Sequence, residues 1–418
     1  MVIFKYRINQ EKCICGNFRH TSNISETNEV WNWEKHTAKE ETKCYGVLPH
    51  SNSPYLRCDV KEVNKVGLVL FGVWNIPIPS MIMRMVGDAT STLNVTLEKE
   101  VLRGISDAAV ASDAWIITSG YKEETTSELI GEIVYKNRVK NAELNFSAIA
   151  VGKWGNIRDR EKLYGSGNRV CKHGPSAPGR YTLEPNHTHY ICFDDGSYNS
   201  PDNGEFASRL ARQISYGARR RIPLVTIVAG GNLYALKSIW VDLIYQVSVV
   251  IVDQSGPLAN ILCKHYKATK NISKATRTQT DEDIDRDKRS SDDENDIDMV
   301  MFEYSFTLPK PGEEPPSTEL TLREVLRPFS KRERLDIYND LLKLYIAIRK
   351  EEYKTAGKKL PAGELLNLGE KRTLANYIFW FATCLTFPLR DNIHIFDFNT
   401  STSLQSTLYG ALVQGKSE

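Results

Sequence analysis

The feature that most constrains this 418-residue chain is an alternation of short apolar runs with helical patterns between residues 66 and 270. Most of the apolar runs are continuous, which is typical of strands buried on both faces of a parallel sheet. The predicted strands are residues 66–71, 81–86, 114–118, 147–151, 189–193, 223–229 and 247–252. The amphipathic stretches between them include residues 93–111, 125–138, 204–220 and 257–270. This order predicts an α/β fold of the Rossmann-like kind, with a doubly wound, mainly parallel sheet.

Composition and charge narrow the class of protein. The formal net charge of +2 offers no concentrated positive field for a phosphate backbone, so we expect no nucleic-acid partner. The eight cysteines are scattered, and several lie in apolar runs, which fits a reducing compartment. The N-terminus has no long apolar segment of the signal-peptide kind, and the apolar run 377–387 is shorter than the roughly 20 residues of a membrane helix. Taken alone, the chain is expected to be soluble and cytosolic, with no direct membrane insertion.

The second half of the chain breaks the pattern. Residues 281–298 carry ten acidic and three basic residues, so we expect a solvated linker. Beyond it, apolar residues recur at helical spacing, followed by a short strand at 393–398 and a helix at 404–414. The predicted regions are an N-terminal cap (1–60), an α/β domain (61–270), an acidic and proline-containing linker (271–318) and a mainly helical segment with a short strand (319–418).

Several predicted strands end in glycine or small polar residues. Glycine lets the backbone turn sharply, and the following helix N-terminus offers N–H groups to an anion. A cleft for phosphate or a nucleotide would follow if these turns share one edge of the sheet, although every α/β fold needs turns. The turn residues are Val86, Gly87, Asp88, Ser119, Gly120, Asp194, Asp195, Gly196, Gly230, Gly231, Ser255 and Gly256.

Motifs of known chemistry are scarce. No G-x-G-x-x-G after a strand, no Walker A motif and no G-x-S-x-G elbow occur, so a dehydrogenase, a P-loop enzyme and an α/β-hydrolase are disfavoured. Cys13 and Cys15, with His20 and His36 downstream, invite a zinc interpretation, but their spacing is poor for a structural site. No metal and no required cofactor are therefore expected, and an N-terminal cap is the favoured interpretation of these residues.

A series of short motifs, in order along residues 13–270, resembles the cytosolic N-terminal region of melastatin-subfamily transient receptor potential (TRPM) cation channels. Each motif is short, and their order and spacing carry the resemblance. They include Cys13-x-Cys-Gly, Trp33-x-x-His, Trp74-x-Ile-Pro, Ala114-Trp-Ile-Ile-Thr, Lys153-Trp-Gly, Glu184-Pro-Asn-His-Thr-His, Asp194-Asp-Gly and Val249-Val-Ile-Val.

The resemblance implies a Rossmann-like fold of the SLOG type, also called LSDAT. In some members the cleft binds ADP-ribose or a related nucleotide that promotes channel opening. The loop around Gly87 would then cradle phosphate, although the family has threonine and two glycines where this chain has Val86, Gly87 and Asp88. Trp154 joins the expected ligand site, Tyr181 would stack on a base or serve as a core tyrosine, and Arg209 would pair a phosphate or remain a solvated helix residue.

The implied function is a regulatory, ligand-sensing and assembly module of a calcium-permeable channel at the cytosolic face of the plasma membrane. Its expected partners are other subunits of a tetramer and the channel's own membrane region, and this chain is expected to be a fragment or derivative without the pore. Two alternatives stay open: a SLOG-type enzyme that processes nucleotides, and a structural interaction domain whose cleft no longer works. Asp194 and Asp195 are expected to shape the cleft and hold its loops rather than act as acid and base.

Overall fold

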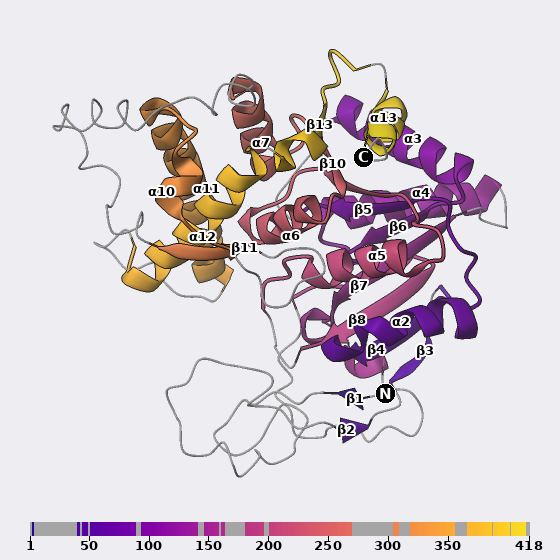
Figure 1. Ribbon diagram of the computed structural model, residues 1–418. Coiled ribbons are helices and arrows are strands. Elements are labelled where there is room, and N and C mark those ends of the chain that lie inside the picture. Colours follow the sequence, from indigo (N-terminus) through magenta and orange to yellow (C-terminus); the bar gives the residue numbers. More distant parts are fainter. Residues whose placement is uncertain are drawn as a thin grey trace, which may run out of the picture. The chain divides into compact units, whose positions relative to one another are not determined.

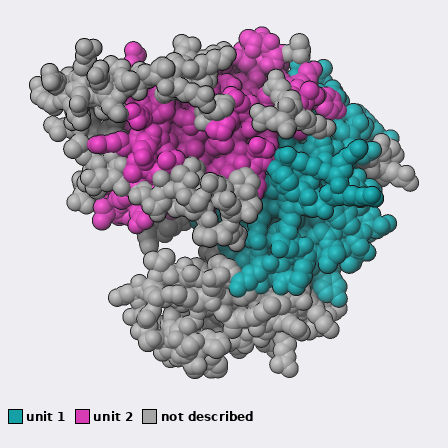
Figure 2. Space-filling model, in the orientation of Figure 1, with its two compact units in different colours: residues 1–227, 403–405 teal, residues 228–402, 406–418 magenta. Residues whose placement is uncertain are grey.

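The computed structural model describes residues 2–3, 40–41, 44–48, 51–88, 93–140, 146–158, 160–163, 180–195, 200–269, 304–308, 318–355, 366–386, 388–401 and 403–414. The chain divides into two compact units, which Figure 2 colours separately. Unit 1 comprises residues 1–227 and 403–405, and unit 2 comprises residues 228–402 and 406–418.

The main sheet has nine strands, in the order β13-β10-β9-β5-β6-β7-β8-β4-β3 (Figure 1). Neighbouring strands from β5 to β8 run parallel, as do β4 with β8 and β10 with β13, whereas β3 pairs antiparallel with β4. The strand bounds are β3 (Tyr45–Val47), β4 (Pro54–Asp59), β5 (Ile82–Val86), β6 (Trp115–Thr118), β7 (Ser147–Lys153), β8 (His189–Asp194), β9 (Leu224–Val228), β10 (Ser248–Val252) and β13 (Ile393–Phe396). The mainly parallel α/β fold predicted from the sequence is confirmed.

The inner strands are buried on both faces, as their continuous apolar runs predicted. Every residue of β5, β6, β9 and β10 is buried. A strand with no polar face must be covered on both sides, so helices pack on each face of the sheet. Removing this apolar surface from water stabilises the sheet.

Helices of unit 1 cover the sheet. Helices α4 (Thr125–Lys140) and α5 (Glu205–Gly217) each contact β5, β6 and β7, while α2 (Val63–Leu68) packs with α5 and α3 (Val95–Ala111) with α4. Figure 1 shows α2 and α5 in front of the strands and α3 and α4 toward the other face. Asn94 caps the N-terminus of helix α3, and its side chain accepts hydrogen bonds from two backbone N–H groups of the first turn.

One predicted strand is wrong. Residues 66–71 form the end of α2 and the start of the π-helical segment η3 (Val69–Val73). Val66 and Leu70 are buried whereas Leu68 and Val73 are 72% and 73% exposed, which is the spacing of a helix with one buried stripe. A short continuous apolar run fits either structure, and here the helical period decides.

Unit 2 contains two helices of the predicted α/β domain and, among the described residues, the helices of the C-terminal part, where the sequence predicted a mainly helical segment. Two of them start with a capping box, built on Thr321 and on Asn367. The bounds are α6 (Leu233–Ile244), α7 (Pro257–Ala268), α10 (Leu322–Leu326), α11 (Lys331–Thr355), α12 (Leu368–Cys384) and α13 (Leu404–Gln414).

Three short segments differ from the predicted regions. Strands β3 and β4 fall in the predicted cap but belong to the main sheet. Strand β11 (Ser305–Leu308), inside the predicted linker, pairs antiparallel with β12 (Thr318–Thr321). The acidic run 281–298 and the residues proposed for zinc lie outside the described residues, and the other predicted boundaries stay predictions.

Candidate functional site

The turn after β5 is packed against the start of α4. Val86 and Asp88 are buried, with 5% and 3% of their surface exposed. A Cβ added at Gly87 would lie 2.5 Å from the Thr126 side chain, and the Asp88 carbonyl accepts a hydrogen bond from the Thr125 N–H at 3.2 Å. The Thr126 side chain therefore occupies the space beside the Gly87 Cα, which leaves no room for a side chain at this position.

The hydrogen-bond donors of the turn after β6 are bonded to other groups of the protein. The Ser119 hydroxyl donates to the Glu124 carboxylate and lies 2.9 Å from the Ser127 hydroxyl. The Gly120 N–H donates to Thr118 Oγ1 at 2.9 Å and to Ser127 Oγ at 3.2 Å. Gly120 has φ +76°, a conformation that favours glycine, but the N–H it presents is already bonded.

Carboxylates gather beside these two turns. Burial raises the pKa of Glu124 to about 8, and the charges of Asp202 and Asp88 push it in the same direction, while its hydrogen bond from Ser119 opposes them. Because a Glu124 carboxyl with this pKa is mostly protonated at neutral pH, any repulsion of a phosphate comes from Asp88 and Asp202 rather than from Glu124. The family loop expected to cradle phosphate is thus acidic in this chain.

Tyr181 stacks on another tyrosine instead of presenting an open face on both sides. Its ring lies 4.6 Å from that of Tyr121, with an interplanar angle of 25°. The Tyr121 hydroxyl donates to Asp202 Oδ2 at 2.8 Å and accepts from the Lys153 N–H at 2.6 Å. This tyrosine pair ties together segments that follow β6, β7 and β8.

The acidic turn after β8 forms ion pairs. Asp194 pairs with Arg57 of the neighbouring strand β4, with Arg57 Nε 2.9 Å from Asp194 Oδ2. Arg57 also stacks over the ring of Trp154, 4.6 Å from its centroid, and Trp154 is 3% exposed. Asp195 pairs with Lys153 at 3.1 Å. Gly196 lies outside the described residues.

The Glu184-Pro-Asn-His segment forms a buried polar network. Glu184 Oε2 accepts from the Asn186 N–H at 2.9 Å and lies 2.6 Å from His187 Nδ1. On the other side of the ring, His187 Nε2 lies 2.8 Å from Thr118 Oγ1, which in turn accepts the Gly120 N–H. The Glu184-Pro-Asn-His motif therefore supports the turn after β6 through the contact between His187 and Thr118.

Arg209 is exposed on α5. It belongs to the same unit as the turns after β5, β6 and β8, but no hydrogen bond between described residues joins it to them. Its predicted pairing with phosphate stays a prediction.

The remaining candidate residues belong to unit 2 and lie in turns that bond to one another. They are Gly230, Gly231, Ser255 and Gly256. The Gly230 N–H donates to Ser255 Oγ at 2.8 Å, and the Ser255 hydroxyl donates to the Val252 carbonyl at 2.5 Å. Helix α7 follows Gly256. In its first turn, the Leu258 N–H donates to the Gly231 carbonyl at 3.2 Å, and the next N–H donates to the Gly230 carbonyl. The N-terminal N–H groups that would attract an anion are thus bonded to the glycine turn itself.

Sequence reasoning placed the turns correctly but missed the residues that fill them. Thr126 and Ser127 open α4, and Glu124 precedes it, in the stretch Glu-Glu-Thr-Thr-Ser. Hydroxyl-rich helix starts are ordinary caps, so they did not stand out. A signal was available, because Ser127 lies eight residues after Ser119 across a single tight turn.

The comparisons with known proteins agree with this fold. The family model described as "SLOG in TRPM" matches residues 53–294, which is more than half of the chain. The chain belongs to this family. It is 26% identical to a transient receptor potential channel of Caenorhabditis elegans over 268 residues, which is 58% of this chain and 13% of that protein.

Two mammalian TRPM relatives match at similar levels. Transient receptor potential cation channel subfamily M member 6 of Mus musculus is 26% identical, over 62% of this chain and 14% of the relative. Subfamily M member 7 of Homo sapiens is 24% identical, over 58% of this chain and 14% of the relative. This TRPM-type SLOG chain therefore spans less than a fifth of the length of these relatives.

Two negative findings concern the described residues only. No helix among them is both long enough and apolar enough to cross a membrane. Within the same residues, no group of three histidine, cysteine, aspartate or glutamate side chains is arranged to hold a metal ion.

Proposed function

We propose that this chain is a cytosolic assembly and regulatory module of a TRPM-like cation channel. The family match and the channel names of its relatives support this function. Its partners would be other subunits of the channel and the channel's membrane region. The module itself performs no chemistry under this proposal.

The hydrogen bonds of the turn after β6 favour an assembly role over nucleotide sensing. A nucleotide phosphate needs free N–H donors, and the Gly120 N–H is engaged by Thr118 and Ser127. A bound anion would also lie near the Asp88 carboxylate. These observations favour the assembly role over an ADP-ribose-sensing role.

A second candidate function, nucleotide processing, has one observation in its favour. Glu124 has a pKa near the range of general acids and is hydrogen bonded to the Ser119 hydroxyl. Burial is the largest cause of that pKa, however, so the shift requires no catalytic role. Incubation of the full chain with a panel of nucleotides, followed by chromatography, would support an enzyme if free base or ribose phosphate appears.

A chimeric channel tests the assembly proposal. Residues 1–418 would replace the corresponding N-terminal region of a TRPM channel that responds to ADP-ribose. We expect the chimera to form tetramers on native gels and to conduct cations without responding to ADP-ribose. Failure to form oligomers, with the chain itself folded by thermal melting, would contradict the assembly role, and a retained ADP-ribose response would restore the sensing role.

A further inference from the structure

Three apolar side chains of unit 1 are largely exposed on one short stretch of the chain. Leu68, Val73 and Ile78 are 72%, 73% and 70% exposed, and together they form what we call the apolar patch. Leu68 ends α2, Val73 ends η3, and Ile78 lies in the loop that leads into β5. Single exposed apolar side chains are ordinary, but a group of them marks a surface that contacts a partner or a membrane.

The π-helical turn brings the first two of these side chains to one face. The Trp74 N–H donates to the Val69 carbonyl at 2.8 Å, so residues five apart lie above one another along this turn. Gly67 and Gly72 are also five apart, and a Cβ added at either would meet no atom within 4 Å. This face of α2 and η3 is therefore open.

The opposite face of the same segment is fixed in the core. Val66 and Leu70 are buried, and the Phe71 ring stacks on that of Trp115 with centroids 5.2 Å apart. Trp115 Nε1 in turn donates to the Pro77 carbonyl at 3.1 Å. The backbone that carries the apolar patch is thus held in place on both sides of Val73.

Three consecutive arginines lie at the same edge of the sheet. Residues 219–221 lead into β9, and all three side chains are exposed. The Pro223 carbonyl accepts from the Ile82 N–H at 2.8 Å, which places the start of β9 beside the start of β5, the strand that follows Ile78. Helix α5, which ends before the arginines, packs with α2. The arginines and the apolar patch therefore belong to one surface.

The net charge of this surface is positive. Residues 63–81 and 214–223 contain Lys65, the three arginines and no acidic residue. Lys65 pairs with Glu62 at 2.6 Å, so the excess comes from the arginines. Asp113, which is exposed before the neighbouring strand β6, offsets one of these charges. The surface remains suited to an anionic occupant.

Two of the arginines are available to such an occupant. The side chains of Arg219 and Arg220 form no ion pair and no hydrogen bond with the residues that the structure describes. Arg221 lies over the ring of Tyr216, 4.5 Å from its centroid, and donates to the Tyr216 hydroxyl at 2.9 Å. Tyr216 is itself 44% exposed, so it extends the surface with an aromatic ring that has a polar end.

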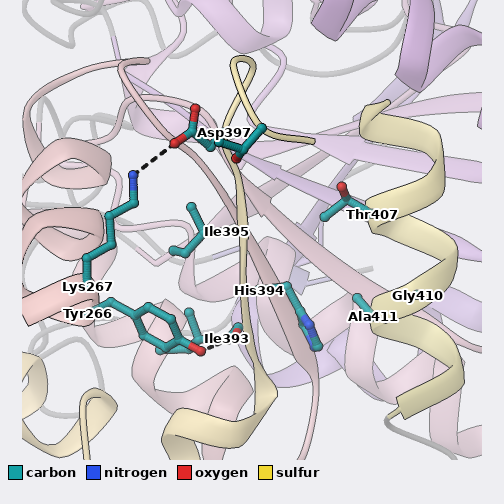
Figure 3. A pocket seen from close by; sticks show the side chains of 10 residues that line it. Tyr266, Lys267, Ile393, His394, Ile395, Asp397, Thr407, Gly410 and Ala411 are labelled. Carbon is teal, nitrogen blue, oxygen red and sulfur yellow. Dashed lines mark hydrogen bonds and ion pairs between the residues drawn. The ribbon is translucent and has the colours of Figure 1, made fainter. Parts of the chain in front are cut away.

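A cavity beside β13 in unit 2 has a different character (Figure 3). Its volume is about 410 Å³, and the two charged side chains that line it, Lys267 and Asp397, pair with each other at 3.1 Å. The Tyr266 hydroxyl in the same wall donates to the Ile393 carbonyl at 3.1 Å. The lining of this cavity therefore does not identify a class of ligand, whereas the surface of unit 1 does.

We propose that the apolar patch and residues 219–221 bind the surface of a membrane that contains anionic lipids. The three apolar side chains would rest at the boundary between headgroups and acyl chains, and the arginines would pair with the headgroups. Apolar side chains that protrude from the surface fit a fluid bilayer better than a rigid partner, which would need a matching groove. The surface lies at the edge of the sheet opposite the turns after β5, β6 and β8, so this role is separate from the proposed assembly role.

Vesicle flotation tests the proposal with the full chain. The vesicles are phosphatidylcholine with about one third phosphatidylserine, at about 0.1 M salt, and pure phosphatidylcholine vesicles are the control. We expect the chain to float with the anionic vesicles and at least tenfold less with the neutral ones. If the chain does not float with the anionic vesicles, the proposal is overturned and an acidic protein becomes the better partner for this surface.

One pair of variants tests the apolar contact. Val73→Ser removes an apolar side chain from the patch, and Val95→Ser changes a valine that is 66% exposed at the start of α3, away from the patch. We expect Val73→Ser to bind anionic vesicles at least about fivefold more weakly, with an unchanged melting temperature, and Val95→Ser to bind like the wild type. Equal binding by the two variants would mean that charge alone holds the chain, which contradicts the proposal.

A second pair of variants tests the charges. Arg219→Glu combined with Arg220→Glu reverses two charges of the surface, and Lys99→Glu combined with Lys122→Glu reverses two exposed charges elsewhere in unit 1. We expect the arginine variant to bind at least about tenfold more weakly than the lysine variant, because each basic residue near an anionic surface adds to the attraction. If both variants bind anionic vesicles equally, the membrane contact lies elsewhere and the proposal is overturned.

Discussion

The Arg57 guanidinium and the Asp194 carboxylate form a buried ion pair across two parallel strands, with Nε 2.9 Å from Oδ2. Their side chains are 9% and 4% exposed. A buried charge needs a partner because its hydration is lost, so each of these groups holds the other in place. Asp194, which the sequence predicted to shape the cleft, thereby joins β8 to β4.

Removing one charge of this pair should destabilise the chain. Asp194→Asn leaves the Arg57 charge buried without its carboxylate, and we expect a loss of about 3 to 5 kcal/mol in the free energy of unfolding. Urea denaturation followed by circular dichroism measures it. Glu132→Gln breaks the exposed pair with Lys136 and is the control, with an expected loss below about 0.5 kcal/mol. Equal effects of the two variants would show that the Arg57–Asp194 pair is not the joint we infer.

Gly131 of α4 should be intolerant of a methyl group. Its Cβ would lie 2.1 Å from Glu184 Oε1, inside the network that holds His187 and Thr118. We expect Gly131→Ala to lower the free energy of unfolding by about 2 to 3 kcal/mol, because the buried carboxylate has to move. Gly217→Ala, at the end of α5, meets nothing within 4 Å and should be neutral or stabilise by about 0.5 kcal/mol. A thermal melt of Gly131→Ala that matches the wild type would disprove the tight fit.

The raised pKa of Glu124 gives a pH dependence with a defined sign. Its folded-state pKa is about 8 against an ordinary 4.5, so its contribution to stability is present below pH 4.5 and is lost as the pH rises through 8. Glu124→Gln removes this titration, and we expect the variant to exceed the wild type by about 2 to 4 kcal/mol at pH 8.5, with little difference at pH 4.5. The check is the free energy of unfolding at several pH values. A difference between the two proteins that does not grow with pH would contradict the raised pKa.

The sequence predicted the inner strands because their continuous apolar runs alternate with amphipathic helical stretches, as in a parallel sheet covered on both faces. It missed β3 and β4, since Pro54, Arg57 and Asp59 interrupt the apolar signal, although Arg57 is buried by its pair with Asp194. It assigned residues 66–71 to a strand because a short apolar run carries no period that separates strand from helix.

The candidate site, like the fold, could be predicted from the sequence only in part. Glycine and small polar residues marked the turns at the carboxyl ends of the strands, and the parallel pairing of β5 to β8 places those of unit 1 on one edge. The sequence could not predict whether each backbone N–H of these turns is already hydrogen bonded, because this depends on which hydroxyl lies close to it in space. Ser127 reaches the Gly120 N–H and Ser255 reaches the Gly230 N–H.

The most direct measurement is a calorimetric titration of the full chain with ADP-ribose at neutral pH, beside a TRPM protein known to bind it. Because the Gly120 N–H is engaged and the Asp88 carboxylate lies near the same site, we predict no saturable heat up to 1 mM, which corresponds to a binding free energy weaker than about −4 kcal/mol. Saturable binding with a micromolar Kd, abolished when Ser119→Asp adds another carboxylate to the turn, would contradict an assembly module whose turns are closed by its own side chains.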